Sequence, residues 1–149
     1  MPGMPEPVPT ALNAPASPPM RRDQTFLAFD FGTRRVGVAS GNTVTHTSQP
    51  LLTIASTGDS RFNAIARLVD EWQPDALVVG VPFHPDGAEH ENTVLARRFA
   101  CQLRGRHRLE VHEVDERYST TEAHSLGAGD VDAASAALIL EQHLRSLAP

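Results

Sequence analysis

Apolar residues are spaced in two different ways along the chain, and the spacing predicts where strands and helices lie. The segments "TFLAFDFG" (25–32) and "DALVVGVP" (75–82) are short and almost wholly apolar, which is typical of strands buried on both faces of a sheet. Three further segments predict strands: "RRVGVASG" (34–41), "TVTHTSQPLLTI" (43–54), which is rich in Thr and Val, and "LEVHEVDE" (109–116), which alternates at first. The first three strands in chain order, with a tight turn at Gly32 and Thr33, predict an antiparallel meander.

Helical spacing begins after the meander. A first helix is predicted with Asp59 or Ser60 as N-cap and its end before Pro74, and its apolar face is Phe62, Ile65, Ala66, Val69 and Trp72. A second helix is predicted over 92–105, and "RYSTTEAHS" (117–125) starts a short helical segment. The last helix is predicted over 131–147, with the apolar stripe Ala133, Ala137, Leu140, Leu144 and Leu147.

These elements predict an α/β fold. Their order, βββαβαβα, favours a mixed five-stranded sheet with three antiparallel strands and two parallel additions, flanked by helices. The 149 residues are enough for one domain with a real core. Residues 1–22 hold seven of the twelve prolines and follow no helix or strand period. We therefore expect a disordered tail over 1–23 and one folded domain over 24–149.

Composition narrows the setting in which the protein works. No stretch reaches the roughly 18 to 20 apolar residues of a membrane span, and the N-terminus lacks the apolar segment of a signal peptide. The single cysteine, Cys101, cannot form an internal disulfide, and its helical context predicts a small buried side chain. The lone cysteine favours a reducing, cytoplasmic location. The lack of a long apolar segment favours a protein without a membrane partner.

Charge is distributed unevenly. The net charge of −5 argues against a strongly cationic nucleic-acid binder. All 13 basic residues are arginines, however, and five of them lie between Arg97 and Arg108 with no acidic residue among them. Guanidinium groups suit bidentate phosphate contacts, so this cluster, with Arg97 and Arg98 at its start, is a candidate nucleic-acid backbone contact. The alternative is that these arginines only complement the dipole at a helix C-terminus.

Three acidic residues stand where an α/β sheet usually places its active site. Asp30 ends the first strand, Glu116 ends the fifth, and Asp132 opens the last helix. Converging carboxylates repel one another unless cations join them, and hard oxygen ligands suit Mg²⁺ or Mn²⁺. Two such ions can activate a water and stabilise the leaving oxygen of a phosphodiester. Each residue also has a simpler interpretation. Asp132 could be only a helix N-cap or a partner of the helix dipole, Asp30 could only order the turn at Gly32 and Thr33, and Glu116 could only pair with Arg117 or Arg34.

Other residues near these acids are candidates for supporting roles. Arg34 and Arg35 follow the turn beside Asp30 and could hold a phosphate, or only flank an exposed strand start. Arg117 adjoins Glu116 and could orient it or bind substrate. His84 and His90 are six residues apart, which is poor spacing for metal ligands, so we expect solvated side chains.

Four blocks carry a resemblance to a known family. In order and spacing, "DFGTRRVGVA", "VVGVPFHPDG", "VDERYSTTEA" and "VDAASAALIL" resemble the YqgF family over residues 25–147. Its members have a ribonuclease-H-like fold, are described as Holliday junction resolvases related to RuvC, and are implicated in maturing the 5′ end of pre-16S rRNA. The resemblance implies that Asp30, Glu116 and Asp132 form an acidic triad that binds the metals.

The segment before the last helix departs from the family. Members have a long, basic, glycine-rich loop there, whereas this chain has only "HSLGAGD" (124–130), without Lys or Arg. The short loop puts the grip on substrate in question, and it offers Asp130 as a second candidate acid beside Asp132.

The leading hypothesis is therefore a metal-dependent nuclease acting on structured nucleic acid. Its implied substrate is pre-16S rRNA in ribosomal precursor particles, cut to leave 5′-phosphate and 3′-hydroxyl ends. One alternative is a resolvase of branched DNA, which needs a suitable dimer; the sequence leaves monomer and homodimer open. A second is an RNA-binding assembly factor without catalysis. A third is a nucleotide-binding protein, since "DFGT" resembles the phosphate loop of actin-like and sugar-kinase ATPases, which need two such domains.

Overall fold

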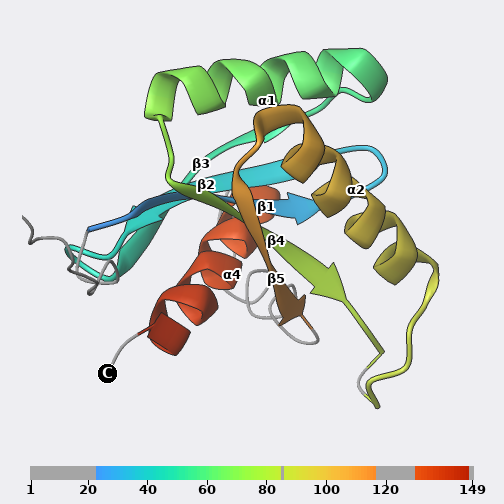
Figure 1. The fold of residues 1–149 in the computed structure, drawn as a ribbon. Helices are drawn as coiled ribbons and strands as arrows, with labels where there is room; N and C mark the ends of the chain where they lie inside the picture. The colour runs from blue at the N-terminus through green and yellow to red at the C-terminus, as the bar shows by residue number, and fades with distance from the viewer. Residues whose placement is uncertain (1–22, 85, 117–129, 148–149) are drawn as a thin grey trace, which may run out of the picture.

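Five strands and three helices make up the part of the chain that the computed structural model describes, residues 23–84, 86–116 and 130–147 (Figure 1). The strands are β1 (Thr25–Phe31), β2 (Val36–Asn42), β3 (Thr47–Ile54), β4 (Ala76–Pro82) and β5 (Glu110–Glu116). The helices are α1 (Gly58–Trp72), α2 (Glu91–His107) and α4 (Val131–Leu147). Residues 1–22 of the predicted tail (1–23) and the whole of the segment 117–125, where a short helical segment was predicted to start, lie outside the described residues.

The strands form one mixed sheet in the order β3-β2-β1-β4-β5. β1 pairs with β2, and β2 with β3, in antiparallel register. β4 joins β1, and β5 joins β4, in parallel register. The predicted sheet, with three antiparallel strands and two parallel additions, is therefore confirmed.

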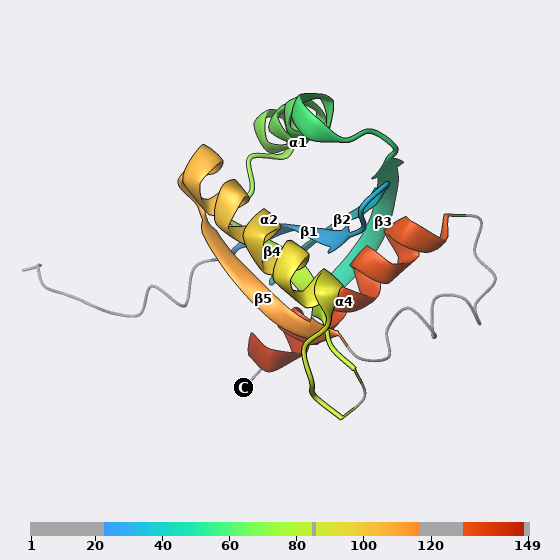
Figure 2. The ribbon, with the colours of Figure 1, turned by 90° about the vertical axis from the view of Figure 1, so that its right-hand side faces the viewer.

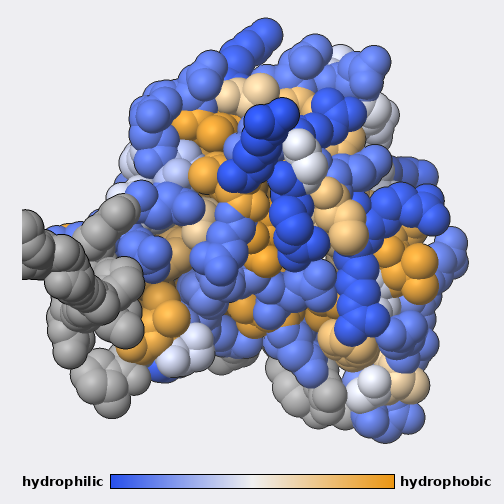
Figure 3. All heavy atoms as spheres, viewed as in Figure 1, coloured by the Kyte–Doolittle hydropathy of each residue, from blue (hydrophilic) through white to orange (hydrophobic). Residues whose placement is uncertain are grey.

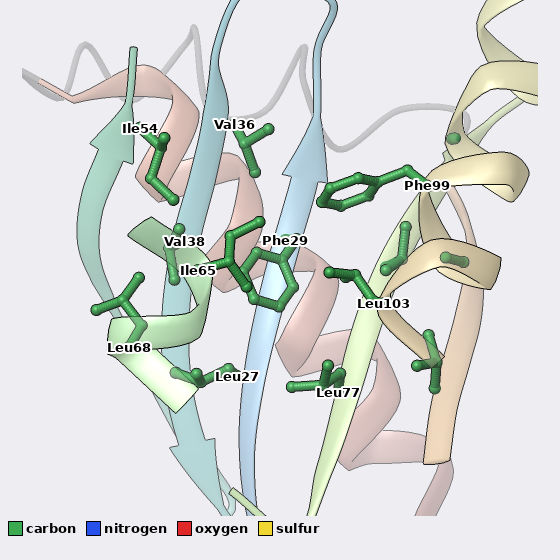
Figure 4. Packing of buried hydrophobic residues seen from close by; sticks show 14 of the residues in the cluster. Leu27, Phe29, Val36, Val38, Ile54, Ile65, Leu68, Leu77, Phe99 and Leu103 are labelled. Carbon is green, nitrogen blue, oxygen red and sulfur yellow. The ribbon is translucent and has the colours of Figure 1, made fainter. Parts of the chain in front are cut away.

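Helices cover both faces of this sheet. α1 and α2 lie on one face and α4 lies on the other (Figure 2). Phe29 of β1 packs beneath α1 and α2, whose Ile65 and Phe99 point toward it (Figure 4). Phe26 and Ala28, which alternate with Phe29 along β1, pack instead against α4. Alternate residues of "TFLAFDFG" thus belong to two separate hydrophobic layers, one between the sheet and α1 and α2, and the other between the sheet and α4.

Helix α4 is buried over most of its circumference. Its alanines and its larger residues are both covered: Ala133, Ala134, Ala136, Ala137, Ile139, Leu140 and Leu144 are nine-tenths or more buried. Small side chains let the helix approach β2 closely, where Ala39 packs against Ala136 and Ala137. Four residues of the predicted stripe are confirmed as buried, but Leu147 is 45% exposed because it lies in the last turn, beyond the sheet.

Several local predictions were wrong. Residues 43–46 form a turn rather than the start of β3, with the Asn42 side chain accepting a hydrogen bond from the Thr45 backbone N–H. The connection from β1 to β2 spans four residues, 32–35, rather than two. The N-cap of α1 is Thr57, and neither Asp59 nor Ser60. Cys101 is exposed, because α2 turns Ala100 and Leu103 toward the sheet and Cys101 away from it.

The surface seen in Figure 3 is mostly hydrophilic, with hydrophobic residues showing in small, scattered areas. Among the described residues, none of the helices is both long enough and apolar enough to cross a membrane.

Candidate active site

Asp30 lies near the end of β1 with a glycine beside it on each neighbouring strand. It pairs with Gly37 of β2 and with Gly80 of β4. In-register partners share a face of the sheet, and Asp30 alternates with Phe29, so all three positions face α4. The carboxyl group therefore points out from the α4 side of the sheet, and the residues paired with Asp30 on the two neighbouring strands have no side chains of their own.

Both glycines make room for another part of the site. A Cβ on Gly37 would lie 1.8 Å from the backbone oxygen of Asp132, so the first turn of α4 rests directly on β2 there. A Cβ on Gly80 would lie 2.3 Å from Cδ1 of Ile139 and 2.7 Å from Oε2 of Glu116, so Ile139 of α4 and the Glu116 carboxylate share the space above Gly80. The sheet thus brings Glu116 and the start of α4 to the two sides of Asp30, as the strand-end positions of the three acids predict.

The electrostatics of Asp30 reflect this convergence. Burial is the largest cause that raises the pKa of Asp30 well above its ordinary value of 3.8, and the negative charges of Glu116 and then Asp132 raise it further. The Ser135 hydroxyl acts in the opposite direction and lowers this pKa. Ser135 is 1% exposed, and its Oγ has no hydrogen bond of regular geometry among the described residues, so it stands beside Asp30 without another partner.

Asp130 and Asp132 have different tasks at the start of α4. Oδ1 of Asp130 accepts hydrogen bonds from the Ala133 backbone N–H, at 3.0 Å, and from the Thr53 hydroxyl, at 2.5 Å. Asp130 is thus the residue that caps α4. Asp132 lies inside the first turn, and its Oδ2 is 3.1 Å from Nε of Arg35. The simpler interpretation of Asp132 as the N-cap is therefore wrong, whereas its place in the first turn agrees with the other interpretation, a partner of the helix dipole.

The donor set suits a hard divalent cation by its chemistry. Asp30, Glu116 and Asp132 all offer carboxylate oxygens, which Mg²⁺ and Mn²⁺ prefer. The part of the raised pKa of Asp30 that comes from Glu116 and Asp132 reflects the cost of holding three carboxyl groups close, and a bound cation would offset that repulsion. Within the described residues, no three His, Cys, Asp or Glu side chains are already arranged to hold a metal ion.

The candidate substrate-binding arginines are used in different ways. Arg35 is paired with Asp132, whereas the exposed Arg34 beside it forms no ion pair with a described residue. Arg97 is paired with Glu89 at 2.6 Å and Glu113 at 3.6 Å. Arg98 next to it is exposed and forms no such pair within the described ranges. The prediction for Arg117 falls outside the described residues.

The rest of the arginine cluster also makes structural contacts. The Arg106 guanidinium lies 4.0 Å from the centre of the Phe62 ring, and Arg104 donates a hydrogen bond to the Val111 carbonyl. These contacts tie α2 to α1 and to β5. Much of the cluster that the sequence offered as a phosphate contact therefore serves to hold helices in place.

Arg61 is a residue near the site that the sequence analysis missed. It is only 6% exposed; Nε donates to the Ser56 carbonyl and Nη2 to the Thr33 carbonyl. Burial lowers the pKa of its guanidinium, although these contacts keep it satisfied. Arg61 thereby ties the β1–β2 connection, which carries Arg34 and Arg35, to α1. Its spacing of four from Ile65 and seven from Leu68 was the signal that it shares their buried face.

The two histidines after β4 lie together near the start of α2. Their ring centres are 4.7 Å apart; His84 is exposed, and His90 is half-buried. His90 is the N-cap of α2, since its Nδ1 accepts a hydrogen bond from the Asn92 backbone N–H. This structural role was not predicted.

An open cavity of about 420 Å³ adjoins Asp130 and Asp132 on the side of β2 and β3. Its lining is polar except for one residue and consists of Arg35, Thr53, Asp130, Val131 and Asp132. The cavity is open to solvent and Arg35 supplies a positive charge in its lining, so it has room for a negatively charged group beside Asp132.

Comparisons with known proteins agree with the motif blocks. The model of the RuvX family, described as Holliday junction resolvase, matches residues 24–146. A relative in Polaromonas sp., named "Putative pre-16S rRNA nuclease", is 67% identical over 124 residues, covering 83% of this chain and 90% of the relative. A relative of the same name in Albidiferax ferrireducens is 60% identical, covering 97% of this chain and 96% of the relative.

A solved structure has a similar fold. T. thermophilus RuvC in complex with Holliday junction substrate aligns with a TM-score of 0.51 and 14% identity, covering 83% of this chain and 94% of RuvC. This likeness confirms the predicted ribonuclease-H-like architecture and concerns the fold alone.

Proposed function

Since the chain belongs to the RuvX family, we propose that it is a nuclease that hydrolyses phosphodiester bonds of structured nucleic acid. Its proposed substrate is the 5′ region of pre-16S rRNA, in agreement with the names of the curated relatives. One observation carries the proposal: the Glu116 carboxylate lies over Gly80 and the turn of α4 that carries Asp132 rests on Gly37, so that the charges of both residues act on Asp30. We propose that these three residues are the catalytic acids, in a cytoplasmic protein that acts on ribosomal precursor particles.

The proposed cofactor is Mg²⁺ or Mn²⁺, in a pair, held by the carboxylates of Asp30, Glu116 and Asp132. When bound, such ions supply an activated water and stabilise charge on the leaving oxygen. Asp30 has to be deprotonated to act as a ligand, and its raised pKa means that protons compete with the cation at low pH. Cleavage in this way leaves 5′-phosphate and 3′-hydroxyl ends.

Arginines would hold the substrate near these acids. Arg34 and Arg35 lie in the connection after β1, and Arg97 and Arg98 lie on α2. Guanidinium groups bind phosphate through two parallel hydrogen bonds, which fixes the position of the backbone. Arg34 and Arg98, which form no ion pair with a described residue, are the better candidates; Arg117 remains a prediction from its place next to Glu116.

Resolution of branched DNA is the second candidate function. The description of the matching family and the similarity to the fold of RuvC favour it. Resolution requires two active sites across one junction, so this function would require a homodimer. Processing of rRNA is compatible with a monomer.

Cleavage assays with matched substrates test both functions. Purified wild type and Asp30→Asn are incubated with pre-16S leader RNA and with a four-way DNA junction, each with Mn²⁺ and with chelator. We expect wild type to cut the leader RNA only with Mn²⁺, and Asp30→Asn to be at least about 100-fold slower, since a ligand of the reacting centre is lost. Circular dichroism checks that the variant is folded.

The alternatives give different outcomes. Cutting of the junction but not of the RNA would establish the resolvase. Equal cutting by Asp30→Asn would contradict the proposed active site. If Asp30→Asn supports 16S maturation in cells as well as wild type does, the protein is an RNA-binding assembly factor rather than a nuclease.

A further inference from the structure

Arg35 is paired with one of the three proposed catalytic acids. Its Nε lies 3.1 Å from Oδ2 of Asp132, with the arginine side chain 64% exposed and the aspartate side chain 31% exposed. The pair therefore lies at the mouth of the site, where ions and solvent have access. It engages one oxygen of the carboxylate that the proposed function assigns to a metal ion.

We infer that Arg35 and the divalent cation exchange at Asp132, and that the released Arg35 guanidinium then binds a substrate phosphate in the adjoining cavity. The inference rests on the proposed function, because it needs Asp132 to be a metal ligand. It adds that the same arginine has two successive partners. Arg35 holds the acid in the metal-free protein and holds the substrate in the metal-bound protein.

The exposure of the pair makes the exchange feasible. An ion pair open to solvent is weak, and salt screens it further. A divalent cation carries twice the charge of a guanidinium and binds carboxylate oxygens directly. Arg35 therefore weakens metal binding modestly and does not prevent it.

The cavity gives the released guanidinium a place to act. Arg35 is the cationic residue in its lining, and the volume of about 420 Å³ is ample for a phosphate with its attached sugar. Asp130, the other acid there, is already engaged by Thr53 and the Ala133 backbone. Once a cation neutralises Asp132, Arg35 is left with a free fork of donors, which is the geometry that phosphate accepts.

Arg34 provides a matched control. It is adjacent in sequence, lies in the same exposed connection and carries the same charge, but has no ion pair with Asp132. Arg35→Gln and Arg34→Gln therefore change the net charge equally at almost the same place. A difference in metal or RNA binding between the two variants therefore reports the pairing of Arg35 with Asp132 rather than the loss of one positive charge.

The first measurement is Mn²⁺ binding to the metal-stripped full chain, by calorimetry and by Mn²⁺ electron paramagnetic resonance. We expect Arg35→Gln to bind Mn²⁺ about two- to fivefold more tightly than wild type, which is the range of an exposed ion pair. Arg34→Gln should stay within about 1.5-fold, and the difference should fade in 1 M salt, where the Debye length is about 3 Å.

The second measurement is binding of leader RNA in chelator and in Ca²⁺. Wild type should gain affinity when Ca²⁺ is added. Arg35→Gln should lose most of that gain, while Arg34→Gln should weaken binding equally in both conditions. Mn²⁺ binding by Arg35→Gln no tighter than that of Arg34→Gln would overturn the exchange and leave the metal-dependent function standing. No Mn²⁺ binding by wild type would overturn the metal-dependent function itself, and the exchange with it.

Discussion

Asp30 is a carboxyl group held where its charge is costly. Its carboxyl group is largely buried on the α4 side of the sheet and faces two further carboxylates, so the folded protein disfavours its ionised form. A functional residue of this kind lowers the stability of the folded protein, because its buried carboxylate is repelled by its neighbours. Either a bound cation or replacement by a neutral side chain would relieve that repulsion. The same residue should therefore show opposite effects on stability and on activity.

Asp30→Asn should stabilise the metal-free protein at neutral pH. The unfolded chain releases the Asp30 proton near 3.8, whereas the folded protein retains it to higher pH, so stability falls as the pH rises between these two values. The variant lacks this loss and should be more stable by about 1 kcal/mol at pH 8, a common size for such a substitution. The gain should vanish below pH 4.

Urea denaturation in chelator at several pH values measures this difference. Glu71→Gln, which removes an exposed negative charge on α1, is the control and should change stability by less than about 0.5 kcal/mol. A variant that is equally or less stable than wild type at pH 8, with no dependence on pH, would contradict the strained carboxyl.

At the scale of elements, the position of α4 decides whether the acids meet. The helix carries Asp132, and it reaches Asp30 only because Gly37 lets its first turn rest on β2. Small residues continue this close approach along the helix, where Ala39 meets Ala136 and Ala137. Packing and site geometry are therefore two aspects of one contact.

Gly37→Ala should disturb both stability and metal binding. The new Cβ would meet the Asp132 backbone oxygen at 1.8 Å, so α4 has to move and take Asp132 with it. Overpacking of this kind costs about 1–3 kcal/mol. We expect a lower urea midpoint and weaker Mn²⁺ binding at a temperature where the variant is fully folded.

Gly105→Ala is the matched control for this substitution. Gly105 lies in α2 with open space where its Cβ would be, so the change should stabilise the protein by about 0.5–1 kcal/mol through helix propensity. Its Mn²⁺ affinity should equal that of wild type. If Gly37→Ala behaves like Gly105→Ala in both assays, the contact between α4 and β2 does not position the site.

The elements themselves could be predicted from local pattern, and their contacts could not. The apolar runs of β1 and β4 and the bounds of α4 follow from side-chain periodicity, which is a property of neighbouring residues. The three acids were predicted as a site because strand ends and helix starts are visible in the sequence and because their motif blocks resemble the YqgF family. The Arg35–Asp132 pair depends on two segments that meet only in the fold, so no short-range signal revealed it. The burial of Arg61, in contrast, had a short-range signal in its spacing from Ile65 and Leu68.

Orientation was the other source of error. Cys101 and Leu147 both lie on helices that were correctly predicted, but which side of α2 faces the sheet, and how far α4 extends beyond it, are set by tertiary packing. A shift of one residue turns a helical position by about 100°, so a buried neighbour says little about the next residue.

At the scale of the whole molecule, a net charge of −5 means that the overall electrostatic field of the protein repels nucleic acid. Attraction then has to come from individual exposed arginines. Several arginines of α2 are engaged within the protein. The Arg97 guanidinium lies 5.3 Å from the centre of the Phe83 ring and is also paired with Glu89 and Glu113. Few phosphate contacts should therefore carry binding, and its salt dependence should be shallow.

The neighbouring residues Arg97 and Arg98 allow a comparison between an arginine engaged within the protein and an arginine available to bind RNA. Arg97→Gln removes two ion pairs and a ring contact, so it should lower stability by up to about 1 kcal/mol. Arg98→Gln should leave stability within about 0.5 kcal/mol, since the exposed side chain has no ion pair with a described residue. It should instead weaken leader RNA binding and reduce the slope of log K against log salt by about 0.7–0.9, the loss of one phosphate contact.

Both variants lose one positive charge from the same turn of α2, so a protein that binds RNA through its general field would treat them alike. Fluorescence titration with labelled leader RNA at several salt concentrations, beside urea denaturation, distinguishes the two cases. Equal salt slopes for Arg97→Gln and Arg98→Gln would mean that α2 contributes only diffuse charge. A reduced slope for Arg98→Gln alone would place one phosphate of the substrate beside α2, on the opposite face of the sheet from α4. The RNA would then have to pass around the end of the sheet where β4 and β5 carry Gly80 and Glu116.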